Sequence, residues 1–386
     1  MPHPAKSTVA DTTPKSRPIV THRRTRQTRS TTQSRLGIIT DRNPPEEERP
    51  VEVPSRDLDP PNEDDSIIFK ALLLELPKVR ESYSFAQRFS TASRAPIEDE
   101  LKLDNGERLE KVVPCWGIMS GLIGKLREAL KSYTQPLETD PFMSRLTVES
   151  RCAHLPSSIC GEHDTEDWVH SAILRPAIAV VQYLLYKDTV RRDFPNISSV
   201  GGQAPIPDGI VFRFSTDRKN AIIAIEFKTH NVLGHSWLRQ IHELIDTSKT
   251  SARGSAAKFC WPDEGLKLDK PTRVLLQLWG QMRSWRVNYM ILSSYEHTYF
   301  FFKPKDESNT LYITNDFKPN NNDLLPATVA FMAVALGIYS IHDLNLPPAD
   351  TKHWTRRKHS LAPGLDPSTF PNPVVTLKLT EIERCA

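Results

Sequence analysis

The pattern of hydrophobic and polar positions changes its period near residue 200. Before that point apolar residues recur at helical spacing, which predicts helices over residues 67–76, 109–133 and 166–186. Ser66 is the expected N-cap of the first helix, and Pro176 predicts a kink or a break in the third. Beyond residue 200, short β-rich runs predict strands at 210–214, 221–227, 288–293 and 298–302, with helices at 233–245 and 273–285.

One later segment has the composition of either a core helix or a membrane span. Residues 324–341 form an uncharged, apolar stretch just within transmembrane length, interrupted by Pro326 and Gly337. A single such stretch near the end of a polar chain is more often a buried core helix, and this is our interpretation. We therefore expect no membrane partner.

Both ends of the chain have the composition of flexible tails. Residues 1–42 are basic and residues 43–65 are acidic and proline-rich, while prolines and a second basic run follow residue 345. A short edge strand is predicted at 374–379. The predicted organisation is a disordered tail over 1–65, a helical extension over 66–159, an α/β domain over 160–344 and a flexible tail over 345–386.

Composition supports a folded body of roughly 280 residues within the 386. The 31 prolines occur with only 15 glycines and no triplet repeat, which excludes collagen. Five scattered cysteines, and no apolar core segment in the first 40 residues, indicate a reducing, intracellular compartment. The run His22–Arg26 predicts nuclear import or a nucleic-acid-binding arm, with a merely solvated tail as the alternative.

Candidate chemistry lies on the predicted hairpin of residues 207–228. With its turn centred on Arg218, Asp208 would face Lys228 and Ile210 would face Glu226. The period of two then places Asp208, Glu226 and Lys228 on one face, at one end of two apolar strands. Two carboxylates at that range can share a Mg²⁺ ion. The alternative is a pair of ordinary cross-strand ion pairs.

These residues resemble a motif of a known superfamily. Pro207-Asp208, a strand, a turn and Glu226-x-Lys228 are similar to the PD-(D/E)XK nucleases, over residues 160–303. The resemblance implies a restriction-endonuclease-like fold with an α-β-β-β-α-β core, here with additional N-terminal helices. It extends to fungal proteins in which such a domain stands alone or near a kinase-like domain. This chain lacks a Gly-rich loop and the His-Arg-Asp and Asp-Phe-Gly motifs, so we exclude kinase activity.

The resemblance also implies roles for individual residues. Asp208 and Glu226 would bind Mg²⁺ or Mn²⁺ and Lys228 would be the catalytic lysine. Glu166 would be an auxiliary acid on the preceding helix, with Asp167 and Glu162 as competitors. Gln277 and Gln281 on a later helix are secondary candidates. The implied function is metal-dependent hydrolysis of DNA or RNA phosphodiester bonds; the alternative is a catalytically inactive domain that binds nucleic acid or protein.

Two other groups of residues have simpler interpretations. Cys152, His154, Cys160 and His163 offer four zinc ligands, but their spacing matches no standard zinc finger. Trp279, Trp285 and Tyr289 could stack on bases, yet aromatic residues in apolar helices and strands usually belong to the core. We do not assign a site to either group.

Overall fold

A computed structural model describes the middle of the chain. The described residues are 62–79, 98–115, 117–136, 143–147, 155–156, 158–186, 195–198, 205–213, 220–233, 257–259, 261–262, 270–304, 309–344 and 346. All of them belong to one compact unit, Pro54–Ala386, and the unit Met1–Val53 lies outside them. Most of both predicted tails, the basic run His22–Arg26 and the predicted strand 374–379 also lie outside the described residues.

The centre of the fold is a mixed sheet of eight strands in the order β2-β3-β4-β6-β7-β8-β1-β5. β4 pairs antiparallel with β3 and parallel with β6, and β8 pairs parallel with β1. The remaining neighbours are antiparallel. The strands are β1 (Lys111–Cys115), β2 (Asn196–Ser198), β3 (Gly209–Phe212), β4 (Ala221–Phe227), β5 (Ala257–Lys258), β6 (Tyr289–Ser293), β7 (Thr298–Phe302) and β8 (Thr310–Thr314).

Helices flank this sheet, which makes the fold mixed α/β. The α-helices are α1 (Ile67–Leu72), α3 (Glu98–Leu101), α4 (Ile118–Leu130), α6 (Glu162–Val169), α7 (Arg175–Tyr186), α8 (His230–Leu233), α10 (Lys270–Trp285) and α11 (Leu324–Ala335). Short 3₁₀ turns occur at η1 (Asn105–Glu107), η3 (Met143–Leu146) and η6 (Ile341–Leu344).

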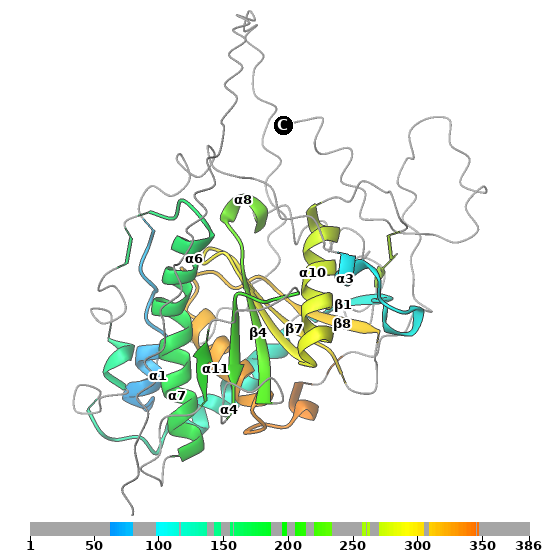
Figure 1. Cartoon of the computed structure of the whole chain (residues 1–386). Coiled ribbons are helices and arrows are strands. Elements are labelled where there is room, and N and C mark those ends of the chain that lie inside the picture. The colour runs from blue at the N-terminus through cyan, green and yellow to red at the C-terminus, as the bar shows by residue number, and fades with distance from the viewer. Residues whose placement is uncertain are drawn as a thin grey trace, which may run out of the picture. The chain divides into compact units, whose positions relative to one another are not determined.

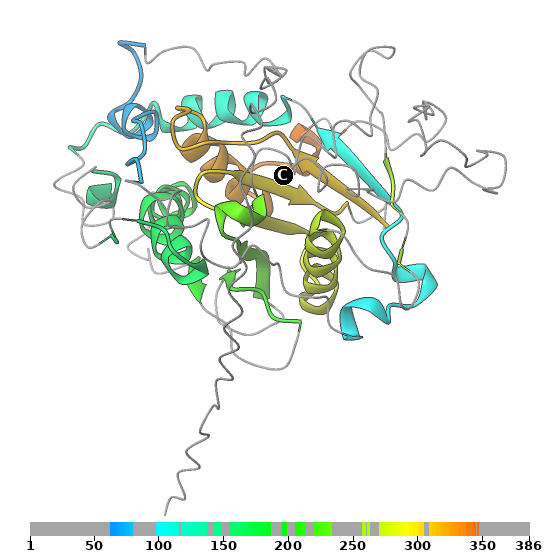
Figure 2. The same ribbon diagram turned by 90° about the horizontal axis from the view of Figure 1, so that it is seen from above.

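The two faces of the sheet carry separate hydrophobic cores, because successive side chains of a strand point to opposite sides. On β4, Ile223, Ile225 and Phe227 join the core formed with α4, α7 and α11. Ala224 joins the second core, formed with α10. Figures 1 and 2 show α10 on one side of the sheet and α4 and α11 on the other. From Ile223 onward, even-numbered positions of β4 therefore face α10, whereas at its start Ala221 packs on that side and Ile222 on the other.

The first two predicted elements differ from the structure. Helix α1 begins after Ser66 as expected, and the Ser66 hydroxyl accepts a hydrogen bond from the Phe69 amide (3.2 Å). The folded part starts earlier, because Asp65 is buried and forms an ion pair with Arg127. The predicted helix over 109–133 is wrong at its beginning: residues 111–115 form β1, and the helix runs from Ile118 to Leu130. Val112 and Val113 favour a strand, and Pro114 would break a helix.

Pro176 does not break the third predicted helix. α6 and α7 are joined by one π-helical turn, His170–Leu174, and the Arg175 amide bonds to the carbonyl oxygen of His170. Proline has no amide hydrogen and its ring crowds the preceding turn of an α-helix. A wider π turn directly before Pro176 relieves that crowding. The helical stretch also starts at Glu162, four residues earlier than predicted.

The interpretation of residues 324–341 as a buried core helix is confirmed as far as Ala335, whereas Gly337 and Ser340 are exposed. Helix α11 is almost wholly buried, and it ends at Ala335. By length and composition the helical stretch Glu162–Tyr186 could cross a membrane, but 72% of its most apolar window is buried inside the protein. One such helix is weak support for a membrane span. Of the predicted helix 233–245 only Leu233 is described, as the last residue of α8, and residues 234–245 lie outside the described part.

Candidate active site

The hairpin register places Asp208 and Glu226 at the same level. The observed pairs are Gly209 with Ile225 and Ile210 with Ala224, so the prediction that Ile210 faces Glu226 is wrong by two residues. A shift of two preserves the face of every side chain. Continuing the observed register by one residue puts Asp208 opposite Glu226. The strand register shifts between Val211 and Phe212, so pairs predicted from the centre of the turn are displaced beyond that point.

Glu226 is a buried carboxylate near the end of β4, and three side chains donate hydrogen bonds to it. Its side chain is 2% exposed. Lys228 Nζ and Gln277 Nε2 donate to Oε1, and Gln281 Nε2 donates to Oε2 at 2.7 Å. Gln277 and Gln281 lie one turn apart on α10, on the side of the sheet that Glu226 faces. The structure therefore brings both secondary candidates to Glu226.

Lys228 is buried between two carboxylates. Besides Glu226, its Nζ donates to Glu162 Oε1 (3.4 Å) and to the carbonyl oxygen of Phe227 (3.0 Å). Burial alone would lower the pKa of Lys228, but the charges of Glu226 and Glu162 outweigh burial and raise it. Its backbone amide bonds to Ser293 at the end of β6 (3.0 Å). Lys228 is therefore a buried ammonium group held in place by its contacts, and the two neighbouring carboxylates favour its charged form.

Asp208 is half-buried and held by the backbone of β4. Its Oδ2 accepts a hydrogen bond from the Phe227 amide at 2.7 Å. Burial raises the pKa of Asp208 to about 7, and the nearby Glu226 carboxylate adds to this effect. The Phe227 amide and Lys228 oppose the shift only in part. Asp208 is thus a carboxylate at which negative charge is poorly compensated.

The structure distinguishes the candidate acids on α6. Glu162 is the one that contacts Lys228, whereas Glu166 lies 3.7 Å from His163 Nδ1 and 3.8 Å from His170 Nε2.

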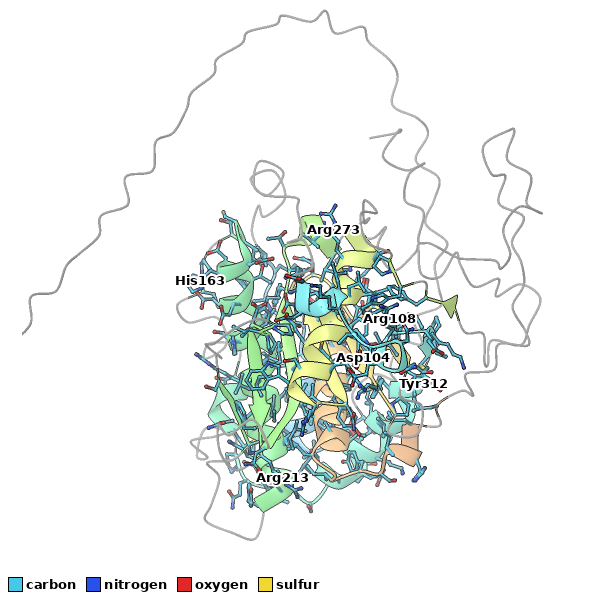
Figure 3. The ribbon with its side chains drawn as sticks, turned by 45° about the vertical axis from the view of Figure 1, so that its right-hand side comes forward. Asp104, Arg108, His163, Arg213, Arg273 and Tyr312 are labelled. Atoms are coloured by element: carbon cyan, nitrogen blue, oxygen red, sulfur yellow. The ribbon has the colours of Figure 1, made fainter. Side chains whose placement is uncertain are left out.

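In Figure 3, His163 at the start of α6 and Arg273 near the start of α10 mark one end of the molecule, and Arg213 after β3 marks the other. Because β3 and β4 are antiparallel, Glu226 and Lys228 lie toward the end marked by His163 and Arg273.

The sequence favours Glu166 over Glu162 only if the helix begins at residue 166, whereas α6 begins at Glu162. The signal for an earlier start lies in Gly161 and Asp164. The Asp164 carboxylate accepts hydrogen bonds from the amides of Cys160 (2.8 Å) and Gly161 (3.0 Å), at the N-terminal end of α6. An acid three residues beyond a potential cap is a recognisable helix-start pattern. The carbonyl of Ile206, which accepts from Gln281 at 3.0 Å, carries no side-chain signal in the sequence.

The charge balance of this group suits a cation. Lys228 supplies one positive charge against the carboxylates of Glu226, Glu162 and Asp208, and the last is destabilised by both other acids. Within the described part of the chain, no three His, Cys, Asp or Glu side chains are grouped so as to hold a metal ion. Mg²⁺ needs fewer, because it typically uses one or two carboxylates with waters and substrate oxygens. The residues present therefore fit a magnesium site built on Asp208 and Glu226.

The other sequence candidates have structural roles or remain unplaced. The Trp279 indole donates to the carbonyl of Glu107 (2.8 Å), and Trp285 donates to Pro205 (3.3 Å). Tyr289 packs edge-on against Phe302 and Phe331. The interpretation of these aromatic residues as core is confirmed for Trp279, whereas Trp285 and Tyr289 are partly buried and pack against the two cores. Cys152 and His154 lie outside the described residues.

Comparison with known proteins adds no relative. No protein-family model matches the chain, and no match was found among curated proteins or solved structures.

Proposed function

We propose that the chain is a metal-dependent nuclease with a restriction-endonuclease-like fold. The observation that carries the proposal is the buried Glu226–Lys228 pair with Asp208 at the same level of the neighbouring strand. The order of elements supports it as well. The α6–α7 helical stretch, the strands β2, β3 and β4, helix α10 and strand β6 occur in the order of the expected α-β-β-β-α-β core, although α8 and β5 intervene between β4 and α10.

Asp208 and Glu226 would hold Mg²⁺ or Mn²⁺. Such an ion polarises a phosphoryl oxygen and neutralises the negative charge that develops during phosphodiester hydrolysis. The protein contributes a fixed carboxylate pair, because Gln277 and Gln281 orient Glu226 while the Phe227 amide orients Asp208. Glu226 Oε2 accepts one described hydrogen bond, which leaves it room for a further partner.

Lys228 has the clearest role in the proposed reaction. Water adds to phosphorus, the bond to the leaving oxygen breaks, and that oxygen takes up a proton as water loses one. The ammonium group of Lys228 stabilises the negative charge that accumulates on the phosphoryl oxygens. Its contacts with Glu226, Glu162 and the Phe227 carbonyl hold it in place, so little reorganisation is needed during the reaction.

A second function is favoured by one feature of the same site. Both oxygens of Glu226 already accept hydrogen bonds from within the protein, and its side chain is 2% exposed. A carboxylate in this condition can be purely structural. A catalytically inactive domain that binds nucleic acid or protein is therefore the alternative proposal.

The deciding experiment is cleavage of labelled single- and double-stranded DNA and RNA by the full chain with Mg²⁺, Mn²⁺ or EDTA. We expect metal-dependent cleavage that is lost in Glu226→Gln and Lys228→Ala. Glu128→Gln, which changes an exposed acid on α4, is the matched control and should cleave normally. Circular dichroism should establish that each variant is folded. Cleavage that persists in both site variants, or a wild type that cleaves none of these substrates, would contradict the nuclease proposal.

A further inference from the structure

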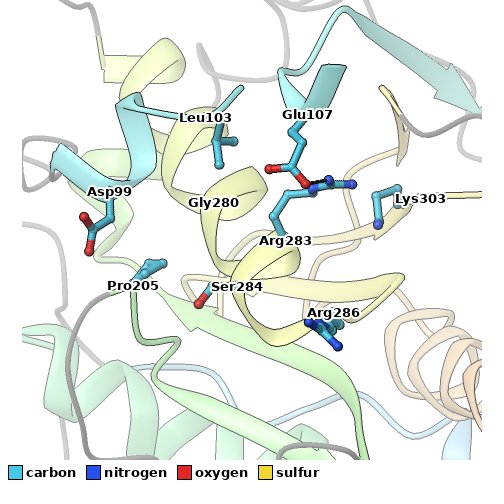
Figure 4. Close-up of a pocket in the computed structure, with 9 residues that line it drawn as sticks. All are labelled: Asp99, Leu103, Glu107, Pro205, Gly280, Arg283, Ser284, Arg286 and Lys303. Carbon is cyan, nitrogen blue, oxygen red and sulfur yellow. Dashed lines mark hydrogen bonds and ion pairs between the residues drawn. The ribbon is translucent and has the colours of Figure 1, made fainter. Parts of the chain in front are cut away.

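A polar cavity lies beside the C-terminal end of α10, and neither Glu226 nor Lys228 lines it. Its volume is about 480 Å³, within the range of ordinary ligand pockets. α3, η1, the segment before Asp208, the end of α10 and the end of β7 all contribute to its wall. Figure 4 shows three cationic side chains there, those of Arg283, Arg286 and Lys303.

The positive charges of this pocket are only partly compensated. Arg283 forms an ion pair with Glu107. Arg286 and Lys303 form no ion pair with any residue in the described part of the chain. Asp99 is the other acid of the pocket, and Figure 4 shows it across the cavity from Lys303. Three cations and two carboxylates thus line the pocket, which leaves an excess of one positive charge.

Lys303 sits in surroundings that disfavour its own charge. Burial lowers the pKa of Lys303, and the neighbouring Arg283 guanidinium lowers it further, while Glu107 compensates only in part. A half-buried ammonium beside a second cation is costly unless an anion completes the site. An anion bound beside Lys303 would therefore stabilise its positive charge.

Arg286 occupies a backbone position that usually belongs to glycine. α10 ends in a Schellman motif: the Arg286 amide bonds to the carbonyl of Arg283 (3.1 Å), and the Val287 amide bonds to Met282 (3.0 Å). The capping residue Arg286 has φ = 55°, in the left-handed region. Glycine adopts that region without steric cost, whereas arginine does not. A strained residue whose side chain lines a pocket suggests that this side chain is needed there.

We propose that this pocket binds a phosphate group through Arg286 and Lys303, with Arg283 as a third cation. The guanidinium matches two phosphate oxygens at once, and the ammonium supplies a point charge. The phosphate belongs either to a small phosphate ester or to the backbone of a nucleic acid. The proposal does not rest on the nuclease function, because none of Asp208, Glu226 and Lys228 lines the pocket.

The test measures the melting temperature of the full chain in EDTA as inorganic phosphate is added, with chloride at equal ionic strength as the reference. A ligand that binds only the folded state raises the melting temperature. The first variant is Arg286→Gly, which removes the cation and relieves the left-handed backbone. We expect it to be at least as stable as wild type without phosphate, yet to bind phosphate about tenfold or more weakly, as the loss of a charged hydrogen bond predicts.

Lys303→Gln is the second variant, and Lys78→Gln, an exposed site elsewhere, is the control with the same charge change. The control should keep the full response to phosphate. Titrations with a nucleoside monophosphate and with an oligonucleotide then distinguish the two possible sources of the phosphate group. If Arg286→Gly weakens oligonucleotide binding, the ligand is the nucleic-acid backbone. If it weakens only monophosphate binding, the ligand is a small phosphate ester. The proposal is overturned if phosphate gives no more stabilisation than chloride, or if both pocket variants respond like wild type. The measurement is phosphate binding in EDTA, so this result is independent of any cleavage assay.

Discussion

Replacing Asp208 by asparagine should stabilise the metal-free protein above neutral pH. Asparagine keeps an oxygen that can accept the hydrogen bond from the Phe227 amide but removes the charge that burial and Glu226 disfavour. The sign follows from linkage: the pKa of Asp208 is raised in the folded state, so its contribution to stability is fully present below its unfolded value of 3.8. That contribution is lost as the pH rises towards about 7.

The size of the effect follows from the same pKa values. The difference between 3.8 and about 7 corresponds to at most about 4 kcal/mol at pH 8. Asp208 is only half-buried and retains some contact with solvent, so we expect about 2 kcal/mol. Urea unfolding in EDTA at pH 5 and pH 8 measures it, since the asparagine variant should gain over wild type mainly at the higher pH.

Magnesium should reverse this order. If Asp208 and Glu226 share the ion, Mg²⁺ stabilises the wild type by binding its folded state and has little effect on Asp208→Asn. Two results would refute the reasoning. One is an equal advantage of the asparagine variant at pH 5 and pH 8, which would mean that Asp208 does not titrate abnormally. The other is an identical response of both proteins to Mg²⁺, which would remove Asp208 from the metal site.

Three further predictions concern neighbouring elements. Gly280→Ala should destabilise the protein by about 1–3 kcal/mol, because an added Cβ would lie 2.7 Å from Glu100 Cγ where α3 crosses α10. Urea unfolding tests this prediction. The control is Gly124→Ala on α4, whose added Cβ meets nothing within 4 Å and should cause no such loss of stability. Burial, and to a lesser degree Arg175, lower the pKa of His170 to about 4, so His170 should reduce stability as the pH falls from 6.5 towards 4, by up to about 3 kcal/mol. His170→Gln should lose less stability than wild type over that range, and equal losses in thermal melts would contradict the assignment. Glu162→Gln should slow nucleic-acid cleavage more than Glu166→Gln, because only Glu162 contacts Lys228; equal rates in a single-turnover assay would count against that distinction.

The residues of the candidate site were easier to predict from the sequence than the strands and helices that surround them. Asp208, Glu226 and Lys228 could be grouped because strand alternation is a local property, and a register error of two residues left their faces unchanged. Gln277 and Gln281 could be named because helical spacing is local as well. β8, in contrast, was missed although Thr310–Thr314 is fully buried, since it depends on pairing with β1 and β7.

The helix predicted over 109–133 also shows that a strand with a distant partner is hard to predict from the local sequence. Its pattern of Ile118, Leu122 and Leu126 is helical and was found to be helical. The residues before it were assigned to the same helix because their apolar spacing alone does not separate a short buried strand from a helix. Their conformation is decided by β8, about 200 residues further along the chain, and distant partners of this kind cannot be read from a local window.

The pairing of β1 with β8 has a consequence for synthesis on the ribosome. Five consecutive residues, from Lys111 to Cys115, align in parallel with Thr310–Thr314, so β1 must wait for nearly two hundred further residues before this partner emerges. The elements from α6 to β6, which carry Glu162, Glu226 and Lys228, are all translated during that interval. Contacts between such distant segments form slowly because a long loop must close first. β1 is therefore without its parallel partner while about half of the chain is made, and an apolar strand in that condition is prone to aggregate until β8 is available.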